Sequence, residues 1–109
     1  MAYNEALATR VRESFAGQIG LVEKKMFGGL GFMIQGNLAC GIIGDDLIVR
    51  VGPNAYANLV MRPHTRPFDF TGRPMKGWLV VEPAGLVADD DLDYWVSLGA
   101  TFAGSLPAK

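Results

Sequence analysis

Apolar residues recur at every second position through much of the segment from Val22 to Val51. Three short turns divide this segment, at Gly28-Gly29, at Gln35-Gly36-Asn37 and at Gly44-Asp45-Asp46. Glycine suits such turns because it adopts the positive φ that short hairpin loops require. Alternation between turns is typical of strands that bury one face. The segment therefore predicts four short antiparallel strands.

Two of these strands show the alternation most clearly. Because successive side chains of a strand point to opposite faces, apolar residues two positions apart share a face. We expect one face of each strand to carry a row of three, with Leu38, Cys40 and Ile42 on the earlier strand and Leu47, Val49 and Val51 on the later one.

Segments on either side of the strands have helical features. Apolar residues at every fourth position from Tyr3 to Phe15 predict a helix over about residues 4–16. Gly52-Pro53-Asn54 predicts the start of a second helix, because proline is tolerated in the first helical turn. This helix must be short, since it has to end before Pro63.

A third helix is predicted over roughly residues 90–103. Asp89, Asp90 and Asp91 precede its apolar pattern, which begins at Leu92. We expect these carboxylates to cap exposed N–H groups and to interact favourably with the helix dipole. A calcium loop would need alternating acidic residues, a central glycine and a distal glutamate. The cluster lacks that spacing, so capping is the preferred interpretation.

Two further strands are predicted between the second and third helices. Prolines between Arg62 and Lys76 exclude a helix there, and residues 67–70 are expected to form an edge strand, where proline is tolerated. The sequence GWLVV at residues 77–81 predicts the last strand. Its two faces would carry Trp78 and Val80 on one side and Leu79 and Val81 on the other.

The predicted order is one helix, four strands, a helix, two strands and a helix. The fold class is therefore α+β, in two layers, with an antiparallel meander sheet of about six strands and three helices packed on a face. Residues 1–109 are expected to form a single domain. Large aromatic residues should supply much of the core, namely Tyr3, Phe15, Trp78, Trp95 and Phe102.

Composition narrows the functional classes. The formal net charge of −1 gives no overall attraction to nucleic acids or anionic membranes. Cys40 is the only cysteine, which excludes an intramolecular disulfide and zinc sites with two or four cysteines in one chain. No apolar run approaches the ~20 residues of a membrane span, and there is no signal-peptide pattern. We therefore expect a cytoplasmic protein.

No catalytic or cofactor motif is evident. His64 lies in a proline-rich loop, and no motif places a nucleophile beside it. Cys40 falls within a predicted strand, where a buried structural thiol is the expected state. The glycines of residues 28–31 resemble a phosphate-binding loop superficially, but a strand follows them where such a loop needs a helix. We expect no enzyme activity, no cofactor and no metal.

Basic residues gather in the middle of the chain. Between Lys24 and Lys76 there are seven basic residues against three acidic ones. They are either a solvated face or a surface for an anion or an acidic partner. Direct DNA reading is disfavoured, because no helix-turn-helix or zinc-finger pattern occurs. The candidate interaction surface consists of Lys24, Lys25, Arg50, Arg62, Arg66, Arg73 and Lys76, of which Arg62, Arg66 and Arg73 would lie in one loop.

A family resemblance covers about residues 3–105. The segment KKMFGGLGF from Lys24 to Phe32 resembles the R/K-x-M-F-G-G-x-G-F motif that opens the TfoX N-terminal domain family, named for a bacterial regulator of natural competence. The later residues that resemble the family are Pro67-Phe68, Gly72-Arg73-Pro74-Met75 and Gly77-Trp78. The motif residues are Met26, Phe27, Gly28, Gly29, Gly31, Phe32, Gly72, Arg73, Pro74, Met75 and Trp78, and all of them have roles in the fold.

The resemblance implies a two-layer fold similar to secretion chaperones and a non-enzymatic role, as a short stand-alone member without the helical C-terminal domain of longer regulators. The leading hypothesis is a regulatory or protein-interaction module with an unidentified protein partner. A second copy of the chain is a further expected partner, through an edge strand or a sheet face. One alternative is a small-anion or nucleotide-binding domain that uses Lys24, Lys25, Arg50 and Arg73. Another is a weak nucleic-acid binder in transcriptional or competence regulation.

Overall fold

The computed structural model describes residues 3–26, 28–69, 72 and 75–108. Its elements follow the predicted order, with an added short 3-10 turn at Pro83–Gly85. The helices are α1 (Glu5–Ser14), α2 (Pro53–Leu59) and α3 (Asp89–Gly104). The strands are β1 (Leu21–Met26), β2 (Gly29–Ile34), β3 (Asn37–Ile43), β4 (Asp46–Arg50), β5 (Thr65–Pro67) and β6 (Trp78–Val81).

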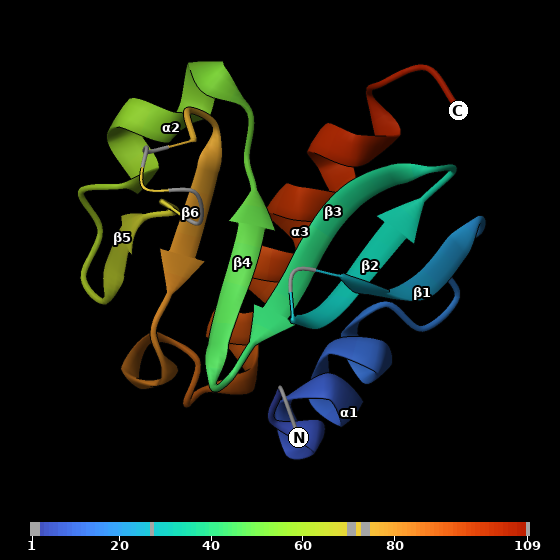
Figure 1. Cartoon of the computed structure of the whole chain (residues 1–109), viewed down its shortest axis with the longest axis horizontal. Helices are drawn as coiled ribbons and strands as arrows, with labels where there is room; N and C mark the ends of the chain where they lie inside the picture. The colour runs from blue at the N-terminus through green and yellow to red at the C-terminus, as the bar shows by residue number, and fades with distance from the viewer. Residues whose placement is uncertain (1–2, 27, 70–71, 73–74, 109) are drawn as a thin grey trace.

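The six strands form one antiparallel sheet in the order β1-β2-β3-β4-β6-β5 (Figure 1). The first four are a meander, and β6 then lies between β4 and β5. This arrangement confirms the predicted α+β fold. It leaves β1 and β5 as the two edges. The edge strand β5 begins and ends earlier than the predicted residues 67–70, and Phe70 lies outside the described residues.

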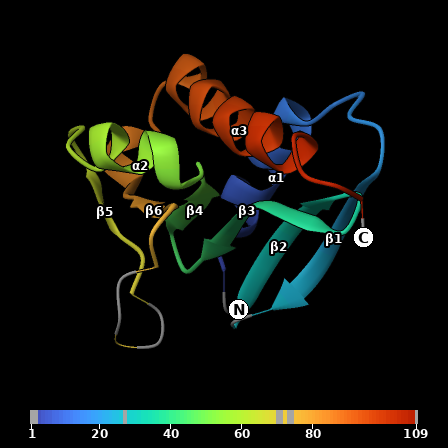
Figure 2. The same cartoon turned by 90° about the horizontal axis from the view of Figure 1, so that it is seen from above.

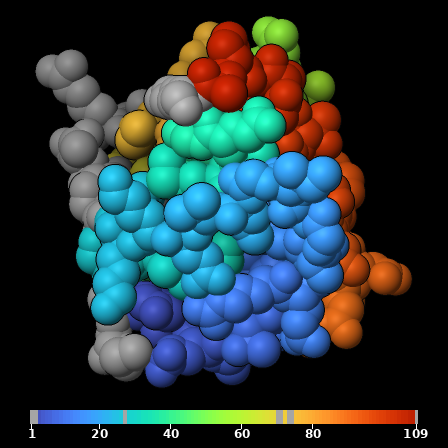
Figure 3. All heavy atoms as spheres, turned by 90° about the vertical axis from the view of Figure 1, so that its right-hand side faces the viewer, coloured from blue at the N-terminus to red at the C-terminus, as the bar shows by residue number. Residues whose placement is uncertain are grey.

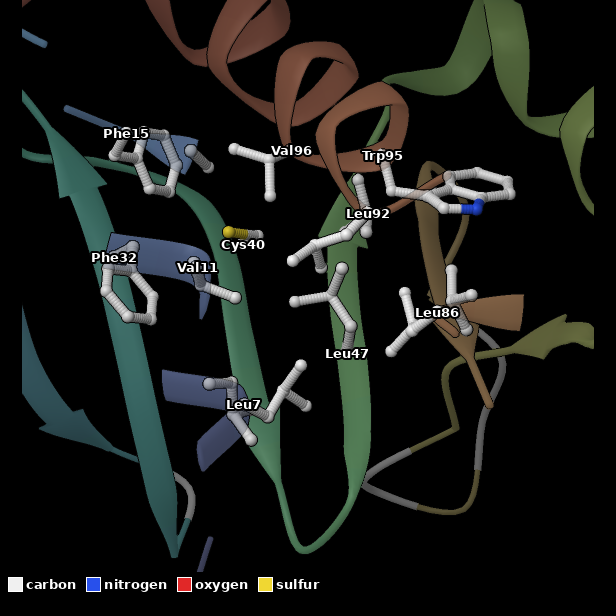
Figure 4. Close-up of a cluster of buried hydrophobic side chains, with 14 of the residues drawn as sticks. Leu7, Val11, Phe15, Phe32, Cys40, Leu47, Leu86, Leu92, Trp95 and Val96 are labelled. Atoms are coloured by element: carbon white, nitrogen blue, oxygen red, sulfur yellow. The ribbon is translucent and has the colours of Figure 1, made fainter. Parts of the chain in front are cut away.

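All three helices cover the same face of the sheet (Figure 2). Side chains from α1 and α3 meet those of the central strands and form the main core (Figure 4). Phe15 stacks on Phe32 with ring centroids 5.6 Å apart, and Trp95, a residue of α3, is also buried. The prediction of the aromatic core is therefore correct for Phe15 and Trp95. Tyr3 is only partly buried, at the margin of this core.

The opposite face of the sheet carries a smaller apolar cluster, which the aromatic prediction missed. Ile48, Val80 and Phe68 are buried there, with Trp78 packed against them. Trp78 thus contributes to this second cluster and not to the core beneath the helices. The difference arises because both faces of β6 are apolar, so the pattern alone did not say which face meets the helices.

A β-bulge in β3 overturns the predicted row of three apolar residues. Cys40 lies opposite Phe32, but Leu38 lies opposite the next residue of β2, Met33, so Ala39 is an extra residue in β3. A bulge shifts the alternation by one position. Leu38 therefore points to the face away from the helices. A Cβ added to Gly31 would lie only 3.0 Å from the Cδ1 atom of Leu38.

Helix α3 packs very close to this bulge. A Cβ added at Gly99 would lie 2.4 Å from the carbonyl oxygen of Ala39, which is closer than real Cβ contacts. Glycine therefore permits the observed distance between helix and sheet. At the start of α3, Ala88 is the N-cap and no side chain caps it. The predicted capping by Asp side chains is wrong in this respect, although Asp89, Asp90 and Asp91 occupy the first turn and favour the dipole.

Candidate interaction surfaces

The glycine motif shapes the hairpin of β1 and β2. Gly28 has a φ of 75° in the turn between the strands. A Cβ on Gly29 would lie 1.9 Å from the Ile42 carbonyl oxygen, and one on Gly31 would lie 2.6 Å from the sulfur of Met26. These glycines permit close contacts with backbone and side chains, as expected of fold determinants. Phe32 is fully buried.

The later motif residues lie near β6. Gly72 has a φ of 83°, and the Met75 N–H donates to the Phe68 carbonyl at 2.8 Å, while the Trp78 N–H donates to the Met75 carbonyl at 3.0 Å. These bonds hold the segment before β6 against the second apolar cluster. The motif predictions at Phe27, Arg73 and Pro74 lie outside the described residues.

The predicted cations do not share one environment. Arg66 lies in β5, not in a loop, and its guanidinium bonds to Asp46 at 3.0 Å and to Glu82 at 3.3 Å. Burial raises the pKa of the Asp46 carboxyl, and Arg66 opposes that effect. Arg66 therefore has carboxylate partners within the fold.

Arg50 and Arg62 instead lie on aromatic rings. The Arg50 guanidinium is 5.2 Å from the ring centroids of both Trp78 and Phe102. Arg62 is 4.7 Å from the Tyr94 ring centroid, and its Nη1 donates to the Tyr94 hydroxyl at 3.2 Å. Neither guanidinium has a carboxylate within 4.0 Å among the described residues. Such cation–π contacts position a charge without neutralising it.

Lys24 and Lys25 lie on the edge strand β1. Lys24 is opposite Gly31 and Lys25 opposite Leu30, so their side chains point to opposite faces of the sheet. Two strands separate β1 from β4, which puts Lys24 about 14 Å from the strand of Arg50. Lys76 is exposed in the turn before β6, and Arg73 lies outside the described residues. The described cations are thus distributed over several parts of the surface.

Chemistry-bearing residues are dispersed as well. Cys40 is fully buried, and burial raises the pKa of its thiol. His64 is exposed at a φ of 64°, and its carbonyl accepts the Glu82 N–H at 2.8 Å. Within the described part of the chain, no group of three or more His, Cys, Asp or Glu side chains is placed to hold a metal ion.

A polar depression of about 470 Å³ lies between α1 and α3. Arg10 donates there to the Leu86 carbonyl at 2.7 Å and to Asp89 at 3.2 Å, and Ser14 donates to Asp93 at 2.7 Å. These bonds connect the helices to each other and to the preceding turn. Four of the residues that line the depression therefore already have side-chain partners within the fold, namely Arg10, Ser14, Asp89 and Asp93.

The outer edge of β1 has backbone groups without a partner among the described residues, and one hydrogen bond identifies which groups these are. Leu21 lies opposite Ile34, so Gly20 lies opposite Gln35. The Gln35 N–H donates to the Gly20 carbonyl at 3.1 Å, which makes this a hydrogen-bonded pair. Such pairs alternate with non-hydrogen-bonded pairs along an antiparallel ladder.

The backbone groups of β1 can therefore be divided into two sets. Those of Val22, Lys24 and Met26 point toward β2, and those of Leu21, Glu23 and Lys25 point away from the sheet. Figure 3, which looks at this edge, has β1 on the surface, and the four central residues of the strand are exposed. The sequence predicted an edge strand at residues 67–70, near β5, but it did not identify β1 as the other edge, because strand order depends on long-range pairing.

None of the helices in the described part of the chain has the length and apolar character needed to cross a bilayer. In the comparisons with known proteins, no curated protein and no solved structure matched the chain. A family model, that of the TfoX N-terminal domain, matches residues 13–103. That range covers most of the chain and includes both stretches of the predicted motif. The chain therefore belongs to the TfoX N-terminal domain family.

Proposed function

We propose that this chain is a non-enzymatic regulatory module that acts by binding protein, and that one of its partners is a second copy of itself, bound through β1. Membership of the TfoX N-terminal domain family supports a competence-regulator-like module. The dispersed cations give little support to the anion-binding and nucleic-acid alternatives, since both need charges that act together.

The observation that carries the proposal is the free edge of β1. Leu21, Glu23 and Lys25 offer three N–H donors and three carbonyl acceptors on a strand of six residues without proline. A long unpaired edge is a template for a further strand. Val22, on the same strand, is 60% exposed, which adds an apolar group beside these backbone groups.

The charges of β1 favour one antiparallel register with a second copy. Hydrogen-bonded pairs between two copies of β1 can form only between residues whose backbone groups point outward, which include Glu23 and Lys25. With Glu23 opposite Lys25 of the second copy, two pairs of opposite charge form on the helix-covered side. Each Glu23 there also accepts two hydrogen bonds from Arg12 of its own chain, at 2.6 and 2.8 Å. Val22 then lies opposite Met26, and Lys24 lies opposite its own copy on the two-fold axis. Each register has one like-charge pair on the axis, Lys24 with Lys24 in the proposed register and Glu23 with Glu23 in the register shifted by one residue on each strand. Only the proposed register also forms pairs of opposite charge, so it is the more favourable of the two.

A cysteine at position 24 tests this register directly. On the two-fold axis, Lys24 forms a non-hydrogen-bonded pair, with Cα atoms about 4.5 Å apart, within the range of disulfides. We expect Lys24→Cys to form a covalent dimer in a glutathione redox buffer, measured on non-reducing gels. Cys40 should add little background, because it is fully buried.

Val22→Cys is the matched control, since position 22 is exposed but faces Met26 in the proposed register. It should stay monomeric on the same gels. Equal cross-linking of the two variants, or none for Lys24→Cys, would contradict self-pairing in this register. Cross-linking of a Glu23→Cys variant alone would instead support the shifted register.

A further inference from the structure

We propose that a groove along α3 binds an acidic, amphipathic helix of a partner protein. The groove has a volume of about 360 Å³, and its lining is mainly apolar. It is lined by Val51, Tyr94, Ser97, Leu98, Thr101, Phe102 and Ser105. Five of these seven residues lie in α3, and Ser105 is its C-cap. Helix α3 lies beside α2 in the helical layer (Figure 2). This surface is separate from β1.

The lining residues of α3 form two parallel rows. Tyr94, Leu98 and Phe102 are spaced four residues apart and make an apolar ridge. The hydroxyl side chains of Ser97, Thr101 and Ser105 have the same spacing and make a second row. Rows of this kind with a groove between them are the surface on which another helix packs. The groove therefore has the shape that helix-in-groove recognition requires.

Two positive charges accompany the apolar ridge. Arg62 lies on the ring of Tyr94 near one end, and Arg50 lies on the ring of Phe102 near the other. Eight residues separate the two rings along α3, a distance of about 12 Å. The lining of the groove contains no carboxylate. The nearest acidic residues on α3 are Asp90, Asp91 and Asp93 in its first turns.

This charge arrangement favours a helix over a small ligand. A small anion with one charged group could satisfy only one of two arginines that lie on rings about 12 Å apart along α3. Two acidic residues about two turns apart on a helix have the matching separation, with room between them for apolar side chains on the same face. A nucleic acid would gain little from an apolar floor, because its affinity comes mainly from phosphate contacts.

The test uses a synthetic helical peptide of about 16 residues that carries two glutamates about two turns apart and leucines between them. A matched peptide has lysines in place of the glutamates. Binding to the full chain is followed by the chemical shifts of ¹⁵N-labelled protein and by fluorescence. Trp78 contacts Arg50 and Trp95 contacts Arg62, so tryptophan fluorescence reports on both ends. We expect saturable binding of the acidic peptide alone, with shifts along α3.

Two pairs of variants locate the site. The double variant Arg50→Gln with Arg62→Gln should bind the acidic peptide about tenfold more weakly. The double variant Lys24→Gln with Lys25→Gln removes the same amount of charge from β1 and should bind the peptide as the parent does. Because both arginines also pack on aromatic rings, their loss could disturb the fold. Thr101→Glu avoids this problem, since Thr101 is exposed. It should repel the acidic peptide, and Thr101→Gln should not.

Several results would overturn the proposal. They are equal binding of the two peptides, unchanged binding by Thr101→Glu, and no saturable binding of the acidic peptide below about 1 mM. Competition by decanoate at similar affinity would show that the groove takes any amphipathic anion. The same shifts produced by unlabelled protein would identify a second copy as the occupant. The Lys24→Cys cross-link tests a different surface, so either proposal can fail alone.

Discussion

At the scale of single residues, Cys40 illustrates how burial controls chemistry. Its side chain is fully buried between the sheet and α3, with Phe32 opposite it on β2 (Figure 4). The low dielectric of that site disfavours the thiolate, which raises the pKa of the thiol. A thiol in this state is a poor nucleophile. The residue therefore contributes to packing.

The raised pKa predicts a specific pH dependence of stability. Above about pH 9 the thiol ionises in the unfolded chain but stays protonated in the folded one, so the unfolded state binds fewer protons. The free energy of unfolding should then fall by up to about 1.4 kcal/mol per pH unit. Urea titrations at about pH 8 and pH 10.5 measure this fall.

Cys40→Ala is the comparison for this experiment, because alanine cannot ionise. We expect the variant to be less stable at the lower pH, since it loses buried volume. The gap between the two proteins should narrow as the pH rises. A gap that stays constant would mean that Cys40 ionises equally in both states. Reaction of the thiol with Ellman's reagent should likewise require urea.

At the scale of elements, the contact of α3 with the bulge of β3 sets the distance between helix and sheet. Gly99→Ala should lower the free energy of unfolding by about 1–3 kcal/mol, because the new Cβ would meet the Ala39 carbonyl at 2.4 Å. This expected loss of stability is opposite in sign to the effect of helix propensity, which favours alanine over glycine by about 1 kcal/mol. Urea denaturation measures the change.

Gly104→Ala is the matched control on the same helix. A Cβ there has no atom within 4 Å, and Gly104 has no positive φ. We expect its free energy of unfolding to stay the same or rise by less than about 1 kcal/mol. A stabilising Gly99→Ala would mean that α3 can move away from Ala39 without loss of packing.

The elements were largely predictable from the sequence, whereas details that depend on partner strands were not. Alternation, helical spacing and the positions of glycine and proline predicted the type and order of all nine main elements of the described chain, although β5 shares only Pro67 with its predicted range. The bulge at Ala39 escaped detection because Leu38 is apolar and is buried even on the face away from the helices. Nothing in the local sequence indicates to which face of the sheet the Leu38 side chain points.

The candidate surfaces were harder to predict than the elements. The basic residues share a region of sequence, but Arg66 is paired across strands while Arg50 and Arg62 lie on rings from β6 and α3. These contacts join residues 16 to 52 positions apart, so their geometry depends on the completed fold. The apolar ridge of α3 did have a local signal in the spacing of Tyr94, Leu98 and Phe102.

At the scale of the whole molecule, pairing through β1 would make thermal stability depend on protein concentration. Association of folded chains stabilises them by mass action, so Tm should rise with concentration. Lys25→Pro should remove this dependence, because it deletes an N–H that points outward and leaves the bonds between β1 and β2 in place. Calorimetry and light scattering over a wide concentration range measure both effects.

The control for that experiment is Arg66→Gln on the opposite edge strand, which should keep the concentration dependence of the parent. A parent that is monomeric with a constant Tm at every concentration would contradict self-pairing. A Lys25→Pro variant that still dimerises would place the contact elsewhere on the molecule.

The two edges of the sheet differ in a way that limits assembly. β5 has only three residues, and Pro67 at its end has no N–H to offer to a neighbouring strand. Each molecule therefore has one sheet edge suited to strand addition, that of β1. When the β1 edges of two molecules pair around a two-fold axis, neither molecule has such an edge left, and the assembly is closed. In the proposed dimer, growth would stop at two subunits, so the exposed strand of this protein would not lead to open-ended fibres.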